Sequence, residues 1–381
     1  MKGRILLSDI DLGKEEISAV VGVLKSKWLT MGEKCEEFER KFADYLNVKY
    51  AFVVSSGTGA LHIACRALGI GNGDDVVCPS LTFVATANSI LYTGARPVFA
   101  DIIGPDNFNI SPSSILEKIS PKTKAIMVVH FAGYPCGMDE IMKIARENKL
   151  FVIEDAAHAP GATYKGKKCG TIGDIGCFSF YANKNLATGE GGMVVTNGDD
   201  LAKKIKALRS HAMTTLTLDR VRGHAYTYDV VDLGYNYRSD ELKSAIGIVQ
   251  LSKLESNNKK RKLLVNEYIR RLTNISEISI PFRKFEGDPS YHIFPILLKN
   301  RMHRKLFMEG LKNEGVQTSV HYSPIHLFSY YRKRFGYREG LLPKTEFVAE
   351  HEVTLPLYPL MKKEDVETIC KIIRKMFRKN H

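Results

Sequence analysis

Several features that would place this chain in a special class are missing from its sequence. The seven cysteines are odd in number and scattered, and no two of them form a Cys-x-x-Cys pair. Neither a disulfide framework nor a cysteine-based zinc site is therefore predicted. No stretch reaches the roughly eighteen apolar residues of a membrane-spanning helix, and the N-terminal residues include acids where a secretory signal needs an apolar core. We therefore expect a cytoplasmic protein that does not insert into a membrane.

Acidic residues are outnumbered, with 42 Asp and Glu against 55 Lys and Arg, which gives a net charge of +13. The basic C-terminal segment carries apolar residues at helical spacing, among them Val366, Ile369 and Ile373. Its charges are therefore expected on the solvated face of a helix, and nucleic-acid binding is not predicted. The positive field would instead attract a polyanionic small molecule. No metal is predicted either, because His321 and His326 lack acidic or cysteine companions at a useful spacing.

The composition is that of an ordinary globular protein, and 381 residues leave room for two domains. Short apolar runs alternate with segments of helical periodicity, which predicts βαβ units and a mainly parallel sheet covered on both faces. We expect an α/β large domain over residues 1–260 with a mainly parallel, mixed sheet. A smaller C-terminal α+β domain is expected over 261–381. The expected strands are 50–54, 75–79, 97–102, 125–130 and 292–298. The expected helices include 14–25, 33–46, 113–119, 138–148, 240–253, a separate helix through Tyr268, 301–313 and 363–377.

Residues 151–196 carry the side chains that point most directly to chemistry. A buried strand ends on the acid pair Glu154 and Asp155, which places carboxylates at the sheet edge where ligands bind in α/β proteins. An aromatic run follows, and then Lys184 just before a glycine-rich turn. In pyridoxal 5'-phosphate (PLP) chemistry a lysine bonds to the cofactor aldehyde and a carboxylate keeps the ring nitrogen protonated. Taken singly, Asp155 could be a cap and Lys184 a solvated cation.

A second feature suits an anion. The apolar run 50–54 leads into Ser55-Ser56-Gly57-Thr58-Gly59, and helical periodicity begins there. A small-residue turn at a helix start presents free N–H groups and the positive end of the helix dipole at one point. By itself the pattern could be no more than a helix cap.

Three motifs together identify a family resemblance. They read EDAAHAPGA over 154–162, GDIGCFSFYANKNLATGEGG over 173–192 and GYNYR over 234–238. The chain closely resembles the DegT/DnrJ/EryC1/StrS-type PLP-dependent aminotransferases, which act on nucleotide sugars and have the aspartate aminotransferase fold, type I. The resemblance runs from Trp28 to the C-terminus.

The resemblance implies a role for each matched residue. Lys184 would hold PLP covalently and Asp155 would pair with its ring nitrogen. The remaining cofactor contacts would come from Gly57, Thr58 and Ser179 (phosphate), Phe83 (stacking on the ring), His158 (phenolic oxygen or ring) and Asn236 (reaching the partner subunit's cofactor phosphate). Substrate contacts are expected from Trp28, Thr30, Arg238, His321 and Tyr322.

The implied reaction moves an amino group, with glutamate as donor, onto a keto group of a nucleotide-linked sugar. Pyridoxamine 5'-phosphate (PMP) would form in turnover, and the enzyme would be a homodimer with shared sites. Three alternatives stay open. A sugar dehydratase of the same group would carry histidine in place of Lys184. A catalytically silent PLP-binding regulator would not need the intact lysine and carboxylate. A general amino-acid aminotransferase would use a dedicated arginine that no motif here identifies.

Overall fold

The structure is a computed structural model that describes residues 5–215, 223, 227–300 and 304–378. Its centre is a seven-stranded sheet with the order β1-β11-β10-β7-β6-β2-β3. Strand β11 runs antiparallel to both of its neighbours, and the other paired strands are parallel. The sheet is therefore mainly parallel and mixed, as predicted. Its strands are β1 (Tyr50–Val54), β2 (Asp75–Pro79), β3 (Arg96–Ala100), β6 (Thr123–Val129), β7 (Phe151–Asp155), β10 (Ile175–Ser179) and β11 (Gly192–Thr196).

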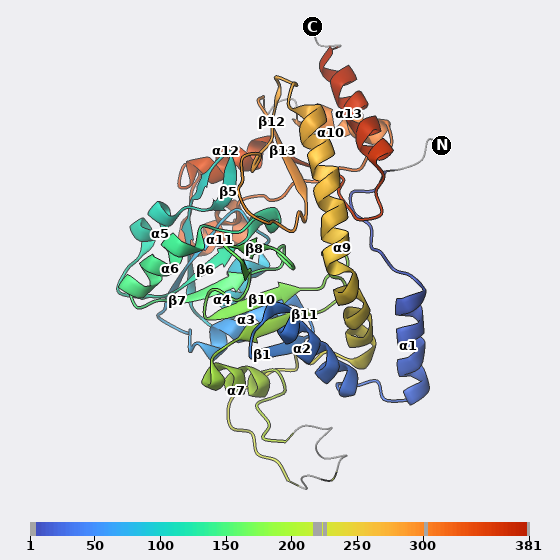
Figure 1. The fold of residues 1–381 in the computed structure, drawn as a ribbon. Coiled ribbons are helices and arrows are strands. Elements are labelled where there is room, and N and C mark those ends of the chain that lie inside the picture. Colours follow the sequence, from blue (N-terminus) through green and yellow to red (C-terminus); the bar gives the residue numbers. More distant parts are fainter. Residues whose placement is uncertain (1–4, 216–222, 224–226, 301–303, 379–381) are drawn as a thin grey trace.

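Alternating side chains of these strands enter cores on opposite faces of the sheet, because successive residues of a strand point to opposite sides. Val76, Ile153 and Cys177 pack under helices of one face, whereas Val77, Val152 and Phe178 pack on the other. The first face is covered by α3 (Gly57–Ala67), α4 (Ala85–Tyr92) and α7 (Asp199–Leu208). The second is covered by α2 (Glu33–Leu46), α5 (Pro112–Lys118), α6 (Met138–Glu147) and the first half of α9 (Glu241–Leu272). Figure 1 shows these layers around the sheet.

Helix α9 is the long element that links the two ends of the molecule in Figure 1. The sequence predicted one helix over 240–253 and a separate one through Tyr268, whereas the structure has a single helix of 32 residues. Leu254 packs in the core beside the large sheet, and Leu264 and Tyr268 pack in a second core. No glycine or proline interrupts the later turns, so nothing in the sequence breaks the helix. The expected domain boundary at 260/261 falls inside this helix and stays a prediction.

The second core is formed by a small antiparallel sheet and the C-terminal helices. Its strands are β12 (Ile278–Ser279), β13 (Phe294–Leu298) and β14 (Glu352–Leu355). Val366, Ile369 and Ile373 are fully buried on the inner side of the last helix, as their spacing predicted. The helices of this core are α10 (Arg304–Asn313) and α13 (Lys363–Arg378). Helix α11 (Ser329–Phe335) packs in the first core of the large sheet, and α12 (Pro343–His351) packs in a separate cluster with Phe108 and Phe131.

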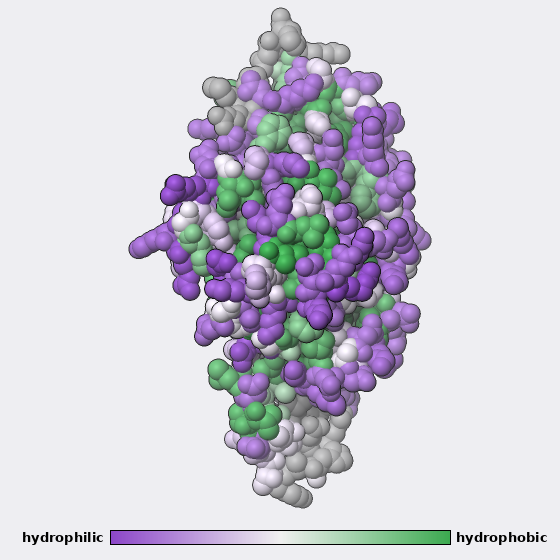
Figure 2. Space-filling model, turned by 90° about the vertical axis from the view of Figure 1, so that its left-hand side faces the viewer, coloured by the Kyte–Doolittle hydropathy of each residue, from purple (hydrophilic) through white to green (hydrophobic). Residues whose placement is uncertain are grey.

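The remaining elements are short or peripheral. Helix α1 (Lys14–Ser26) packs along α9, and two hairpins are formed by β4 (Ile102–Gly104) with β5 (Asn107–Ile110) and by β8 (Thr163–Tyr164) with β9 (Lys167–Lys168). In the part of the chain that the structure describes, short 3-10 helices span Phe131–Gly133 and Ile325–Leu327. No helix among the described residues is long and apolar enough to span a bilayer. Figure 2 shows a mostly hydrophilic face on which apolar side chains gather in separate patches.

Candidate active site

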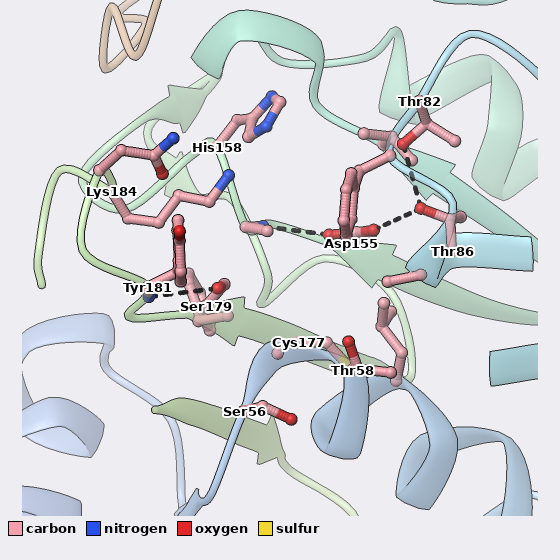
Figure 3. A pocket seen from close by; sticks show the side chains of 18 of the residues that line it. Ser56, Thr58, Thr82, Thr86, Asp155, His158, Cys177, Ser179, Tyr181 and Lys184 are labelled. Carbon is pink, nitrogen blue, oxygen red and sulfur yellow. Dashed lines mark hydrogen bonds between the residues drawn. The ribbon is translucent and has the colours of Figure 1, made fainter. Parts of the chain in front are cut away.

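A cavity of about 410 Å³ lies at the carboxyl ends of β7 and β10, beside the start of α3. This volume is within the usual range for small-molecule sites, and the position is the ligand-binding edge of a parallel sheet. Figure 3 shows Lys184, Asp155, His158, Ser179 and Thr58 around this space. The sequence-predicted residues that line it are Gly57, Thr58, Phe83, Asp155, His158, Ser179, Lys184, His321 and Tyr322.

The start of α3 forms one wall of the cavity and is suited to an anion. Ser56 caps the helix, and its Oγ accepts the Gly59 N–H at 3.0 Å. Gly57 and Thr58 are the first helical residues, so their N–H groups have no partner inside the helix. A Cβ atom on Gly57 would lie 2.7 Å from the Cβ of Ser179, so this close approach of α3 to β10 requires glycine. The N–H groups and the Ser179 hydroxyl therefore face one small volume.

Asp155 forms the opposite wall and is held by fixed donors. Its Oδ2 accepts the Thr86 hydroxyl at 2.8 Å and its Oδ1 accepts the Ala157 N–H at 3.2 Å. Thr82 lies 3.0 Å from Thr86 and continues this hydrogen-bonded row (Figure 3). Burial raises the pKa of the Asp155 carboxyl, although these two donors oppose the shift. A cation placed next to this carboxylate would be stabilised strongly.

Glu154, the other member of the acid pair, points to the opposite side of β7. Its two oxygens accept the N–H groups of Gly170, Ile172 and Gly173 at 2.6 to 2.7 Å, and His130 Nε2 lies 2.9 Å away. It does not line the cavity. Glu154 therefore fixes the turn that precedes β10, and only Asp155 is available to a ligand.

Lys184 follows β10 in the turn that leads to β11, where its N–H donates to the Tyr181 carbonyl at 2.8 Å. Burial lowers the pKa of its amine to about 8, with partial opposition from the Asp155 charge. An unperturbed lysine side chain has a pKa of about 10.4, so a much larger share of the Lys184 amine than of an exposed lysine is neutral and nucleophilic at physiological pH. The glycine-rich turn after it packs tightly, since a Cβ atom on Gly192 would lie 2.5 Å from the Ser56 carbonyl oxygen.

Phe83 and His158 lie where the sequence placed them, at the cavity. The Phe83 side chain is 59% exposed, so it is not core filler, and its stacking on a cofactor ring stays a prediction. His158 is buried, and its Nδ1 accepts the Ala132 N–H at 3.3 Å. The proton of the neutral ring is therefore on Nε2, which lies 2.9 Å from the Tyr322 hydroxyl. His158 thus orients Tyr322, and its contact with a cofactor oxygen stays a prediction.

His321 belongs to a buried network with Thr354 and Glu352. The Thr354 hydroxyl lies 2.5 Å from Glu352 Oε1 and 2.8 Å from His321 Nδ1, so it links the two side chains. Glu352 Oε2 also accepts the His321 N–H at 2.7 Å, and burial raises the pKa of Glu352 to about 8. The network holds the ring through Nδ1, so Nε2 is the ring nitrogen that His321 can offer to a ligand in the cavity.

Four predicted site residues lie outside the cavity of their own chain. Thr30 and Arg238 line a second cavity of about 160 Å³ that also includes Arg209. Trp28 lies in the groove between α1 and α9. Asn236 pairs through its backbone with Ser210 and does not line the Lys184 cavity. One chain therefore does not bring these four residues to Lys184.

Sequence reasoning missed several residues that shape the site. Thr82 and Thr86 lie within three residues of Phe83 in the sequence, so their closeness to a predicted site residue was an available signal. His292, whose Nε2 is 3.5 Å from Lys184 Nζ, is 108 residues away in sequence and had no local signal. Among the described residues no group of three or more His, Cys, Asp or Glu side chains could hold a metal ion. His326 bonds instead to Ser80 and Glu346.

An amine with a lowered pKa, a buried carboxylate and an anion-binding helix start surround one cavity in this α/β fold. These are the groups that a PLP-dependent enzyme of fold type I needs for the aldehyde, the ring nitrogen and the phosphate of the cofactor. The described residues therefore fit PLP.

Comparison with known proteins agrees with this chemistry. The model of the DegT/DnrJ/EryC1/StrS aminotransferase family matches residues 10–374, so the chain belongs to this family and is a PLP-dependent sugar aminotransferase. The spore coat polysaccharide biosynthesis protein SpsC of Bacillus subtilis is 40% identical over 368 residues, covering 95% of this chain and 94% of that relative.

Solved structures show the same likeness. PseC of Helicobacter pylori, an aminotransferase involved in the biosynthesis of pseudoaminic acid, superposes with a TM-score of 0.93 at 31% identity, covering 99% of this chain and 100% of its own. Spr1654 of Streptococcus pneumoniae has been solved in a PLP form (TM-score 0.90, 30% identity) and a PMP form (0.92, 29%), each covering 98% of this chain and 99% of its own. The cofactor predicted from the sequence, PLP with PMP in turnover, is thereby confirmed for the family.

Proposed function

We propose that this chain transfers an amino group from glutamate to a keto group of a nucleotide-linked sugar, with Lys184 and Asp155 as its catalytic residues. The observation that carries the proposal is the amine of Lys184, whose pKa is lowered to about 8 in the cavity that Asp155 also lines. When bound, PLP supplies an aldehyde for this amine and a ring that withdraws electrons from the reacting carbon.

Each residue then has a task that follows from its position. Asp155, fixed by Thr86 and Ala157, would keep the ring nitrogen of the cofactor protonated. The N–H groups of Gly57 and Thr58 and the Ser179 hydroxyl would hold the phosphate. As a free amine, Lys184 Nζ would accept the proton that leaves the donor carbon. Its lowered pKa keeps that amine able to accept a proton near neutral pH.

The sugar side of the cavity is assigned to His321 and Tyr322. His321 Nε2 and the Tyr322 hydroxyl can bond to sugar hydroxyls, which fits a polar substrate. A nucleotide diphosphate would be attracted by the net charge of +13. PseC takes part in the biosynthesis of pseudoaminic acid and SpsC in that of a spore coat polysaccharide, and both support a sugar pathway for this chain.

We also propose a homodimer with shared sites. Trp28, Thr30, Asn236 and Arg238 lie outside the cavity of their own chain, which suits residues that serve a partner. Apolar side chains are exposed in the segment just before the motif at 234–238. Leu233 is 72% exposed, and Tyr228, Val230 and Val231 are also exposed. Apolar side chains in such a group are typical of a surface that another chain covers. The cytoplasmic location expected from the sequence stays a prediction that cell fractionation would check.

The test of the catalytic assignment uses the purified holoprotein. Borohydride reduction should fix the cofactor to the peptide that contains Lys184, as read by peptide mass spectrometry. Lys184→Ala should abolish amino transfer from glutamate to a panel of keto nucleotide sugars while the protein stays folded. Lys143→Ala, at an exposed lysine, is the matched control and should keep full activity. Turnover by Lys184→Ala at the control's rate would refute the assignment.

The shared site has its own test. Lys184→Ala and Asn236→Ala should each be inactive, and mixing the two under conditions of proven subunit exchange should restore part of the activity, because a hybrid dimer has one intact site. Size-exclusion chromatography with light scattering gives the oligomeric state. No recovery of activity in the exchanged mixture would contradict sharing.

A further inference from the structure

A row of buried polar side chains lies directly behind Lys184. It consists of His292, Asn185 and Asn258, whose side chains come from three separate parts of the chain and are 3%, 6% and 8% exposed. His292 Nδ1 lies 2.9 Å from Asn185 Oδ1, and Asn185 Nδ2 lies 2.8 Å from Asn258 Oδ1. Burying so many polar atoms is costly unless all of them are paired, so the direction of each bond can be worked out.

Two main-chain carbonyls fix the direction of this row. Asn258 Nδ2 donates to the Pro160 carbonyl at 2.9 Å, and Asn185 Nδ2 donates to the Ser290 carbonyl at 2.7 Å. A carbonyl oxygen only accepts, so neither amide can be turned round without placing an oxygen against an oxygen. Asn185 Oδ1 is therefore the atom that faces His292, and it must accept a proton from His292 Nδ1.

The state of the imidazole follows from its neighbours. Burial lowers the pKa of His292 well below its usual value, and the nearby positive charges of Lys184 and Arg261 lower it further. Arg261 also donates to the main-chain carbonyl of His292 at 3.1 Å, which holds the backbone in place. The ring is thus neutral with its single proton on Nδ1. Its Nε2 carries a lone pair, and this atom lies 3.5 Å from Lys184 Nζ.

We propose that His292 is a positioning residue for Lys184, accepting one N–H of its amine so that the nitrogen lone pair is turned into the cavity. A neutral amine has two N–H bonds and one lone pair, so fixing one N–H restricts where the lone pair can point. The same acceptor would receive the amine whenever its covalent link is broken. The inference rests on the role proposed for Lys184.

The contact also has an electrostatic consequence. A neutral acceptor stabilises the ammonium form less than a carboxylate would, so His292 can hold the amine without raising its pKa far. The titratable groups that face Lys184 are Asp155, His158, His292 and His321. Burial lowers the pKa of all three histidines, so they are neutral near pH 7, whereas the Asp155 charge opposes the lowering of the lysine pKa. Removing His292 should therefore leave an amine that is even harder to protonate.

The test follows the chemistry of Lys184 in apo-protein rather than turnover. His292→Leu removes the acceptor, His292→Gln keeps one, and His351→Leu is the control at a buried histidine whose ring bonds to the Phe347 carbonyl. Pulse acetylation across a pH series, read by peptide mass spectrometry and normalised to exposed Lys143, gives the midpoint for the Lys184 amine. The second readout is the rate at which added PLP becomes attached to Lys184, as measured by borohydride trapping. It is measured at a pH above the Lys184 midpoint of every variant.

The wild type should titrate with a midpoint near 8. His292→Leu should lower that midpoint by about one pH unit, because the ammonium form loses a hydrogen-bond acceptor. It should also slow PLP attachment by roughly tenfold, because the neutral amine is no longer oriented. His292→Gln should restore most of the wild-type midpoint and most of the attachment rate. His351→Leu should match the wild type in both.

Either of two results would overturn the assignment of His292. One is a wild-type midpoint and attachment rate in His292→Leu. The other is equal loss in His292→Leu, His292→Gln and His351→Leu, since that pattern reports general damage. Attachment of PLP to a lysine other than Lys184 in the wild type would instead overturn the proposed function together with this inference. The two failures are therefore distinguishable.

Discussion

Two neighbouring carboxylates of β7, Glu154 and Asp155, differ in how fully they are satisfied. Glu154 has three backbone N–H groups and His130 around it, and although burial alone would raise its pKa, these partners lower it. Asp155 has one hydroxyl and one backbone N–H, and burial prevails, so its pKa is raised.

The difference separates a structural carboxylate from a functional one. A carboxylate whose lone pairs are all taken by fixed donors stabilises the fold and has nothing left for a ligand. A carboxylate that is buried, faces a cavity and has spare lone pairs is poised to pair with a cation that arrives there. Adjacent positions on one strand can hold both kinds because they point to opposite faces of the sheet.

The largest expected effect concerns catalysis. Asp155→Asn should reduce amino transfer by roughly 10²–10³-fold, because the ring nitrogen loses the charge that keeps it protonated. Steady-state rates per mole of bound cofactor give the measurement. Asp139→Asn, at an exposed carboxylate, serves as the control. A rate within a factor of two of the control would show that Asp155 is no more functional than its neighbour.

Glu154→Gln should have the opposite phenotype. Replacing the charged acceptor of four fixed donors should cost about 3 kcal/mol or more of stability, while the activity of the folded fraction stays close to that of the wild type. Urea unfolding monitored by circular dichroism gives the free energy. A large loss of activity in fully folded Glu154→Gln would erase the distinction between the two carboxylates.

Thr86→Val tests whether the support of Asp155 matters. Losing the hydroxyl that donates at 2.8 Å should raise the pKa of Asp155 further and lower the rate roughly tenfold, which is about 1.4 kcal/mol. Thr86→Ser keeps a hydroxyl and should restore the rate. If the valine and serine variants behave alike, the hydroxyl does not act on Asp155.

The smallest effect is on the pH dependence of stability in apo-protein. As pH rises, ionisation of Glu154 should stabilise the folded protein, whereas ionisation of Asp155 should destabilise it. The lowered pKa of Glu154 means that its stabilisation is present above the unfolded pKa and is lost as pH falls through the folded value. The raised pKa of Asp155 means that its contribution is present below the unfolded pKa and is lost as pH rises through the folded value. Asp155→Asn should therefore stabilise apo-protein at neutral pH, by about 1 kcal/mol. Unfolding curves at neutral and acidic pH that shift the same way for both variants would contradict this.

Local patterns predicted much of the fold. Helix α2 and strands β1 and β2 have the predicted bounds, because their apolar periodicity and flanking turns lie within a few residues of one another. The two helices expected on either side of residue 260 proved to be one. A polar stretch between apolar faces looks like a break in the sequence, but α9 passes from one core to another and turns a different side to each.

The residues of the candidate site also fall into those that local motifs predicted and those that they did not. Lys184, Asp155 and the start of α3 were predicted because each stands in a compact motif, and the fold brings all three to one cavity. His292 and Thr354 carry no such motif, since their importance comes only from the atoms they meet.

The sequence by itself determined the family, the cofactor chemistry and the side chains that can perform it, because reactive groups and the turns that present them are local. Only the tertiary structure decided which of two adjacent carboxylates faces the cavity, and which ring nitrogen carries the proton in His158 and in His292. It also decided which residues lie outside the cavity of their own chain. Those properties depend on burial and on hydrogen-bond partners more than a hundred residues away, and no local pattern records them.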